Sequence, residues 1–335
     1  MRSVSSRRCA FFNLFSFVFS LYHPRTMSQP VLLLLGALAL FGVVYLVGWT
    51  ILAKKAASEP SPPEAKPSGT SVLHVITGFL TNFFDALGIG SFATTTAVFR
   101  FFKSVPDRVI PGTLNVGHTL PTLAQAFIFV ALIQVDITTL VAMIAAAVAG
   151  AWLGAGVISK WPRRRVQWGM GIALFVAAML FAATNLGLMP GGTEGTFALR
   201  GTRLYLGLLG NFFLGALMTL GIGLYAPCMI LVALLGMNPT AAFPIMMGSC
   251  AFLMPVASLR FIKEKSYAFK AAVGLAIGGI FGSLIAGLVV KSLNLVTVRW
   301  LVIVVVLYAA VTLLMAAMRR DDDPAGQSKG GATAV

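Results

Sequence analysis

The chain has 335 residues, of which 58% are hydrophobic and only 10% are charged, although its formal net charge is +15. A soluble globular domain carries about 25% charged residues, so this composition excludes an ordinary soluble enzyme or binding domain. Apolar runs of membrane-spanning length recur along the chain, and we therefore expect an all-α polytopic membrane protein. The Lys and Arg lie mostly in short segments between these runs. The positive-inside rule of membrane proteins therefore explains the positive charge, and we expect no nucleic-acid partner. The cysteines form neither a metal-ligand spacing nor a disulfide framework, so we expect no metal and no cofactor.

The N-terminal part of the chain is predicted to stand apart from the rest. Residues 1–29 form an extension with a short apolar stretch, for which two interpretations stay open. Either translation begins at Met27 and the extension is a mis-assigned start, or it is a weak extra membrane segment. Residues 30–53 are predicted to form an N-terminal transmembrane helix. Residues 54–71 are rich in proline and charge, which predicts a flexible cytoplasmic linker.

Two glycine pairs interrupt long apolar runs further along the chain. The sequence Leu-Gly-Ile-Gly at residues 87–90 lies within the apolar run 72–102. The same four residue types return at 220–223 within the run 204–235, at an offset of 133 residues. Glycine costs roughly 1 kcal/mol relative to alanine inside a helix, so both pairs predict a break at membrane depth.

The same offset predicts a duplicated unit. It also relates glycines and prolines outside the breaks, and such residues mark backbone geometry. The further matched pairs are Pro106/Pro239, Pro111/Pro244 and Gly154/Gly287. Each unit is predicted to contain one broken helix pair followed by three transmembrane helices. The predicted bounds are 72–188 for repeat 1, 189–203 for a connecting loop, 204–318 for repeat 2 and 319–335 for a disordered tail.

The loop charges distinguish two topologies for these units. If each broken run crosses the membrane once, the Lys and Arg divide almost evenly between the two sides. If each run instead dips in and returns as a re-entrant pair of half-helices, one side collects 16 of them and the other 4, counted from Met27 and without Lys329. The positive-inside rule favours the re-entrant topology.

The re-entrant topology implies two inverted repeats, preceded by the extra N-terminal transmembrane helix. A re-entrant pair with three spans crosses the membrane an odd number of times, so the second copy is upside down relative to the first. Inverted repeats with interrupted helices that meet near the midplane are typical of secondary transporters. Two single-crossing runs with glycine kinks are the alternative.

The residues around the breaks resemble the sulfite exporter TauE/SafE family, also called the TSUP transporters. The resemblance covers residues 72–318 and rests on a Gly-x-Gly break in each half, on Pro227 after the second break, and on proline-containing loops. The family's usual Gly-x-Gly-Gly-Gly cluster is altered in both halves, and the first half lacks the proline. The resemblance implies a multi-pass permease of the plasma membrane (the bacterial inner membrane), and not an enzyme.

The same resemblance implies the partners. The substrate would be a small anion such as sulfite, a sulfonate, thiosulfate or a small organic anion, and its transport would be proton-coupled. The lipid bilayer is the other expected partner, and a homo-oligomer is compatible with everything in the sequence.

The helix ends at the breaks are predicted to form the anion site. Free N–H groups and the helix dipole attract anions, and hydroxyl groups donate hydrogen bonds without adding a charge. The candidate substrate-binding residues are Gly88, Gly90, Ser91, Thr94, Thr95, Asn115, Gly221, Gly223, Tyr225, Cys228 and Ser249. The alternative for the Ser and Thr residues is a hydrogen bond to a carbonyl of their own helix.

Two ionisable residues are candidates for proton coupling. Asp85 lies inside an apolar run three residues before Gly88, and an ionisable group within the membrane is a functional candidate by default. Its alternative role is to cap free N–H groups at a wet helix break. His118 titrates near physiological pH in water, and its alternative is a histidine satisfied between helices.

Two other functions stay compatible with the sequence. One is an intramembrane hydrolase with Ser91 as nucleophile and His118 as base. It explains only the first repeat, because Leu224 stands at the position that matches Ser91. The other is an anion channel, for which no ring of charged residues is visible.

Overall fold

The computed structural model describes residues 28–57, 71–158, 163–186, 195–218, 224–292 and 295–318. These residues form α-helices and short 3-10 helices, and the β-structure among them is one isolated bridge between Thr196 and Met237. The helices are α2 (Gln29–Ala57), α3 (Ser71–Ala86), α4 (Ser91–Phe101), η2 (Asp107–Val109), α5 (Ile110–Leu132), α6 (Ile137–Ile158), α7 (Arg163–Asn185), α8 (Gly201–Met218), α9 (Tyr225–Leu234), η3 (Pro239–Ala241), α10 (Ala242–Lys263), α11 (Phe269–Ser292) and α12 (Leu295–Met318). The all-α class is confirmed.

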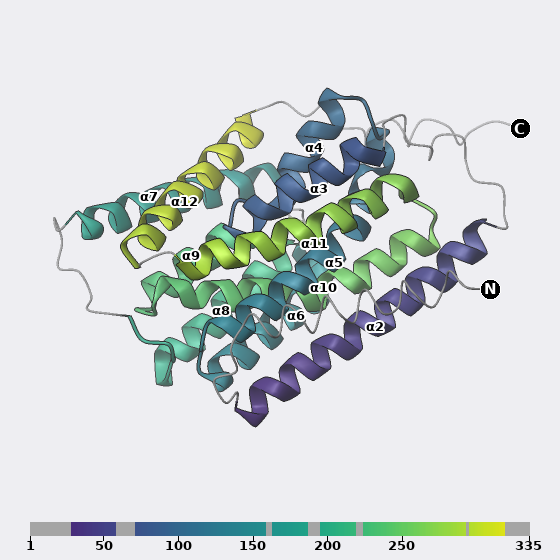
Figure 1. The fold of residues 1–335 in the computed structure, drawn as a ribbon. Helices are drawn as coiled ribbons and strands as arrows, with labels where there is room; N and C mark the ends of the chain where they lie inside the picture. The colour runs from purple at the N-terminus through teal and green to yellow at the C-terminus, as the bar shows by residue number, and fades with distance from the viewer. Residues whose placement is uncertain are drawn as a thin grey trace, which may run out of the picture.

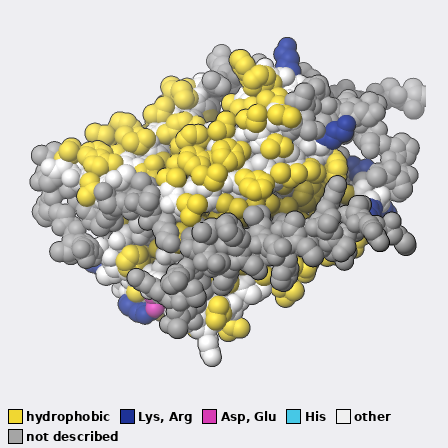
Figure 2. Space-filling view, viewed as in Figure 1, with side chains coloured by type: hydrophobic (Ala, Val, Ile, Leu, Met, Phe, Trp, Pro, Cys, Tyr) yellow, Lys and Arg dark blue, Asp and Glu magenta, His cyan; other side chains and the backbone are white. Residues whose placement is uncertain are grey.

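Five of the described helices are long and apolar enough to cross a membrane. They are Gln29–Lys55, Ile110–Leu132, Pro239–Lys263, Phe269–Val290 and Trp300–Met318. On the face drawn in Figure 2, apolar side chains cover much of the described surface between the two ends, and Lys and Arg lie toward those ends. The chain is therefore a polytopic membrane protein, as its composition predicts.

Some predicted features lie outside the described residues. These are residues 1–27 of the N-terminal extension, residues 58–70 of the linker, residues 189–194 of the connecting loop, the tail 319–335, and the second break with Gly221 and Gly223.

The first break turns the chain back on itself. Gly88 has φ 99° and Gly90 has φ 83°, a region of backbone conformation that glycine enters at low cost because it has no Cβ. The ring of His74, near the start of α3, lies 5.8 Å from the ring of Phe99, near the end of α4. Helices α3 and α4 therefore form a hairpin, and they lie side by side in Figure 1.

Helices α8 and α9 form a second hairpin of the same kind. Leu231 of α9 packs against Gly210 of α8, and Leu235 packs against Gly207. As the position in α9 advances, the contact in α8 moves back, so the two helices are antiparallel. The end of α9 lies near the start of α8, where Gly236 faces the Arg203 guanidinium.

Segments far apart in the sequence meet at one end of the helices, which we call the basic end. The Trp49 indole N–H near the end of α2 donates to the Tyr267 hydroxyl in the α10–α11 loop at 3.3 Å. The Thr113 hydroxyl, in the first turn of α5, accepts from the Ala268 N–H of that loop at 2.9 Å. Phe99 at the end of α4 packs in a cluster with Ala268. The Lys and Arg of these segments are Lys54, Lys55, Arg100, Lys103, Arg108, Arg260, Lys263, Lys265 and Lys270.

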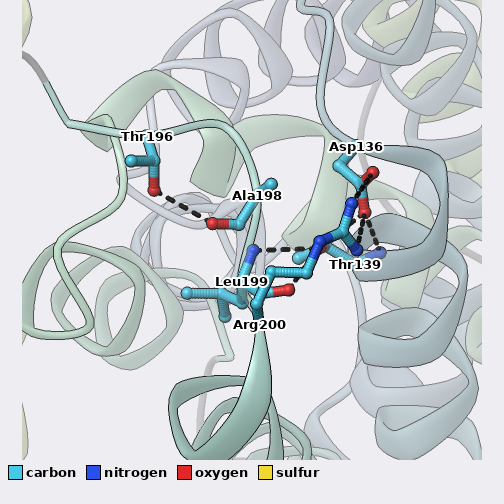
Figure 3. Close-up of polar contacts among 6 residues, drawn as sticks. All are labelled: Asp136, Thr139, Thr196, Ala198, Leu199 and Arg200. Atoms are coloured by element: carbon cyan, nitrogen blue, oxygen red, sulfur yellow. Dashed lines mark hydrogen bonds and ion pairs between the residues drawn. The ribbon is translucent and has the colours of Figure 1, made fainter.

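A second group of segments meets at the opposite end, which we call the Asp136 end. The Asp136 carboxylate accepts two hydrogen bonds from the Arg200 guanidinium, at 2.8 and 3.1 Å (Figure 3). The same carboxylate accepts from the Thr139 N–H and hydroxyl, each at 3.0 Å, and so caps the start of α6. The bridge between Thr196 and Met237 brings the α9–α10 loop to this end. Because α3 starts at the basic end and α8 starts at the Asp136 end, the hairpins enter the molecule from opposite ends.

Glycines allow the helices of the two halves to approach closely. A Cβ at Gly278 or Gly282 of α11 would meet a backbone carbonyl of α3, and a Cβ at Gly150 of α6 would meet the Phe212 carbonyl of α8. Small residues at such positions let membrane helices pack backbone against backbone. Each hairpin's first helix is thus held by a helix from the other half of the chain.

The helix bounds repeat along the chain. Adding 133 to the bounds of α3 to α7 reproduces the bounds of α8 to α12 to within three residues. For example, α4 at 91–101 becomes 224–234, and α9 is Tyr225–Leu234. The pairing repeats as well, because α11 packs on α3 and α6 packs on α8.

Candidate functional site

Asp85 joins the two hairpins at their tips. It lies in the last turn of α3, about 20 Å along the helix from its start, and its exposed fraction is 2%. Its Oδ1 accepts from the Ser91 N–H at 2.6 Å, and its Oδ2 accepts from the Tyr225 hydroxyl in a longer contact of 3.4 Å. Ser91 opens α4 and Tyr225 opens α9. The carboxylate therefore meets the N-terminal ends of the returning helices of both hairpins.

The two glycines of the first break have different surroundings. A Cβ at Gly88 would lie 2.9 Å from the Met229 sulfur and 3.3 Å from Val305 Cγ1. A Cβ at Gly90 would have no neighbour within 4 Å. The backbone at Gly88 is thus packed against α9 and α12, whereas the backbone directly before Ser91 has free space beside it.

His118 connects α5 to both helices of the first hairpin. Its Nε2 lies 3.0 Å from the Thr95 hydroxyl in α4. Its Nδ1 lies 2.9 Å from the Asn82 amide nitrogen and 3.2 Å from the Asn82 amide oxygen in α3. All three side chains are fully buried. Which ring nitrogen carries the proton depends on these contacts, since the tautomer is set by the partners.

Gln125 extends this polar layer to α11 and to Asp85. Its amide nitrogen donates to the Asn82 carbonyl at 3.3 Å and to the Ser283 hydroxyl at 3.1 Å. The side chain also lies close to the Asp85 carboxyl, and its Oε1 is buried without a hydrogen-bond donor. A connected set of buried polar groups thus surrounds the first break.

The site contains donors but no fixed positive charge among the described residues. Among the described residues, the ion pairs join Arg200 to Asp136 and Arg260 to Glu264, and both pairs lie at helix ends, away from the site. In the same part of the chain, no group of three His, Cys, Asp or Glu side chains is placed to bind a metal ion. The arrangement is suited to a small anion, which helix N-termini and hydroxyl groups bind without a counter-charge.

Several predicted site residues bond to their own helices instead. The Thr94 hydroxyl donates to the Ser91 and Gly90 carbonyls, the Ser249 hydroxyl to the Ile245 carbonyl, and the Asn115 amide to the Pro111 carbonyl. Each has the alternative role expected of a short polar side chain in a helix. The structure does not bring them to Asp85.

The cysteines near the second hairpin are buried. Cys228 and Cys250 are free thiols, and the Cys250 sulfur lies 3.9 Å from the sulfur of Met218 at the end of α8. Cys250 also interacts with Asp85 and Tyr225. Cys228 lies within α9, three residues after Tyr225.

The sequence did not single out Asn82 and Ser283, although both belong to the polar layer. Asn82 lies three residues before Asp85 on α3, so the two share a helix face. A second polar residue on the same face of an apolar run was the signal that would have found it. For Ser283 no comparable signal exists, because serine is common in membrane helices and its partner Gln125 is 158 residues away.

Comparison with models of protein families supplies the identity. Residues 3–181, more than half of the chain, match the model described as "Sulfite exporter TauE/SafE". The chain belongs to the sulfite exporter TauE/SafE family. The match covers α2 to α6 and most of α7, including the first hairpin with Asp85 and His118, and it does not reach the second hairpin. Comparisons with curated proteins and with solved structures gave no match.

Membership in the TauE/SafE family establishes the general activity. Its members are membrane transporters of the sulfite or anion exporter type, not enzymes. With the apolar helices described above, this makes the chain a multi-pass membrane transporter.

Proposed function

We propose that this TauE/SafE protein is a proton-coupled carrier of a small anion in the bacterial inner membrane. The substrate would be sulfite, a sulfonate, thiosulfate or a small organic anion. The observation that carries the proposal is the double contact of Asp85 with the Ser91 N–H and the Tyr225 hydroxyl. Two helix starts from different hairpins thus present donors to one negatively charged group, and the substrate anion uses the same donors.

The proposal includes an inverted-repeat architecture. Three findings support it: the helix bounds repeat at an offset of 133 residues, the hairpins enter from opposite ends, and the pairing of α11 with α3 repeats as α6 with α8. In inverted-repeat carriers, access alternates because one repeat moves against the other around a fixed site. A site shared between the hairpin tips would be exposed to each side in turn.

We assign the transported proton to Asp85, with His118 as a second candidate. Asp85 is buried and has no cationic partner among the described residues, and such a carboxyl is costly to keep ionised within a membrane. Both ring nitrogens of His118 have neutral partners, Thr95 and Asn82, so a role in tying α4 to α3 explains its position as well.

The hydrolase alternative lacks geometric support. A serine nucleophile needs its base within hydrogen-bond reach, and the His118 nitrogens contact Thr95 and Asn82. Ser91 lies beside Asp85 instead, whose Oδ1 accepts from the Ser91 N–H.

Transport by purified protein in proteoliposomes tests the proposal. We expect uptake of labelled sulfite, methanesulfonate or thiosulfate that a pH gradient drives above equilibrium. Tyr225→Phe removes a hydroxyl that binds the anion, and a hydrogen bond to a charged group is worth about 1.5–3 kcal/mol. Transport by this variant should therefore fall about tenfold or more.

Tyr308→Phe is the matched control, because Tyr308 lies in α12 and is 40% exposed. It should transport as the wild type does. Uptake that only equilibrates the anion, whatever the pH gradient, would indicate a channel and contradict the carrier. An equal loss of transport in Tyr225→Phe and Tyr308→Phe would contradict an anion site at the hairpin tips.

A further inference from the structure

The Asp85 carboxylate already occupies the place that an anion would take. It accepts from the backbone N–H that opens α4 and from the hydroxyl of the residue that opens α9. These helices have 11 and 10 residues, long enough for each N-terminus to carry its share of positive dipole charge. The contact to Tyr225 is 3.4 Å, longer than the 2.6 Å to Ser91, so the carboxylate holds one donor more loosely than the other.

A substrate anion and an ionised Asp85 cannot share these donors. The two negative charges would lie within a few ångströms of each other in a buried site, where like charges disfavour each other strongly. Asp85 is 2% exposed, and among the described residues it has no Lys or Arg beside it to offset the second charge. Protonation of the carboxyl removes the conflict, because a neutral carboxyl carries no charge, accepts hydrogen bonds more weakly and gains an O–H donor.

A separate observation at the same place shows where that donor is needed. The Gln125 side chain lies close to the Asp85 carboxyl, and its own Oε1 is buried without a donor. A buried acceptor without a partner is uncommon in native structures and calls for an explanation. A protonated Asp85 brings an O–H donor into a neighbourhood that contains an unsatisfied acceptor.

We propose that Asp85 is a tethered occupant of the anion site, which leaves the Ser91 and Tyr225 donors when it is protonated. This rests on the proposed anion site. Each bound anion then requires one proton on Asp85, and release of the anion lets the carboxylate return to the donors. The anion and the proton consequently cross the membrane in the same direction, with one proton for each anion.

The other titratable groups near Asp85 do not supply this proton. Tyr225 from α9 and Cys250 from α10 interact with the carboxyl, and Cys228 from α9 interacts with Cys250. Phenols and thiols ordinarily lose their protons only near about pH 10 and pH 8.5, so they stay neutral around pH 7. From α5, Gln125 does not titrate, and His118 has its own partners in Thr95 and Asn82. From α12, Val305 is apolar.

Calorimetric binding of methanesulfonate and thiosulfate to the purified full-length protein tests the proposal. Both probes remain ionised between about pH 5 and pH 8, so any pH dependence belongs to the protein. For the wild type, Kd should rise about tenfold per pH unit once Asp85 is ionised, because one proton is linked to each anion. Titration in buffers with different ionisation enthalpies should show uptake of about one proton per anion.

Asp85→Asn keeps an oxygen that can accept from Ser91 but cannot ionise. Its Kd should be independent of pH and its proton uptake close to zero. Asp136→Asn is the matched control, since Asp136 also caps a helix start but lies at the opposite end, and it should keep the wild-type pH dependence.

Wild-type binding without proton uptake would overturn the proposal and leave the proposed anion site intact; this measurement needs no variant. Proton uptake that persists in Asp85→Asn would also overturn it, by placing the proton elsewhere, with His118 the next group to replace. If no probe bound to any variant at any pH, the anion site and the tethered occupant would both be refuted.

Discussion

At the scale of single residues, Asp136 combines two stabilising roles. Its carboxylate caps the start of α6 through the Thr139 N–H and pairs with Arg200 at the start of α8. Burial acts to raise the pKa of Asp136, but the hydrogen bonds from Thr139 and Arg200 and the Arg200 charge outweigh it, so the pKa lies below its ordinary value of 3.8. The ionised form is therefore the one that the fold favours.

Replacing this residue should destabilise the protein measurably. Asp136→Ala removes the helix cap, which typically costs about 1 kcal/mol; the ion pair adds little because the Arg200 side chain is 66% exposed. The matched control is Glu264→Ala, whose partner Arg260 is 81% exposed, and it should leave stability almost unchanged. Thermal unfolding in detergent compares them. Equal midpoints for the two variants would contradict the capping role.

The pH dependence of this effect has a definite sign. Because the pKa of Asp136 is lower in the folded protein than its ordinary value of 3.8, its stabilisation is complete above that value. It is lost as the pH falls through the lower folded value. The difference in unfolding midpoint between wild type and Asp136→Ala should therefore be constant near neutral pH and shrink only below about pH 4.

At the residue scale, the sequence singles out a residue where it is unusual for its surroundings, and its role in the site stays a prediction. Asp85, Ser91 and Tyr225 were all candidates, and the structure brings them into contact. Pairs such as Asp136 with Arg200 could not be found in this way. They are 64 residues apart, each is ordinary for a loop, and only the packing of α6 against α8 makes them neighbours.

At the scale of elements, the break between α3 and α4 needs glycine for different reasons at its two positions. Both glycines have positive φ, and a Cβ there costs roughly 1–2 kcal/mol in backbone strain. Only at Gly88 would the Cβ also crowd Met229 and Val305, and overpacking costs typically about 1–3 kcal/mol more.

Alanine substitutions separate these contributions. Gly90→Ala should lower the thermal unfolding midpoint moderately, through backbone strain alone. Gly88→Ala should lower it further, because α9 and α12 must shift to admit the methyl group. Gly36→Ala in α2, where a Cβ meets nothing within 4 Å, provides the background effect. If Gly90→Ala were as destabilising as Gly88→Ala, the result would contradict the close packing of Gly88 against α9.

Helix existence was predictable from apolar runs, but helix ends were less so. Helix α2 continues to Ala57 beyond the predicted end at residue 53, because Lys54 and Lys55 in the last turn are favourable at a helix C-terminus. Helix α5 begins at Ile110, and Pro111 is tolerated in its first turn because the missing N–H is not needed there. Helix α8 begins at Gly201, three residues before the predicted start, in a first turn that is exposed and therefore outside the apolar pattern.

At the scale of the whole molecule, the charges and the fold lead to one orientation. The described Lys and Arg gather mainly at the basic end, where α2 ends and α3 starts. Under the positive-inside rule we expect this end to face the cytoplasm and the Asp136 end to face outward. The two topologies considered for the broken runs differ in one respect: a hairpin returns α4 to the basic end, whereas a single crossing would carry it to the other side.

Cysteine labelling in intact cells decides between these topologies. In a Cys9→Ser background, where the remaining native Cys228 and Cys250 are buried, the sites Lys54→Cys, Arg108→Cys and Thr202→Cys are each exposed. An impermeant maleimide should label Thr202→Cys directly, because α8 starts at the Asp136 end. Lys54→Cys and Arg108→Cys should both react only after the membrane is opened, because α3 and α4 form a hairpin that returns to the cytoplasm. Labelling of Arg108→Cys from outside, with Lys54→Cys still protected, would mean that the first broken run crosses the membrane and that the repeats are not inverted.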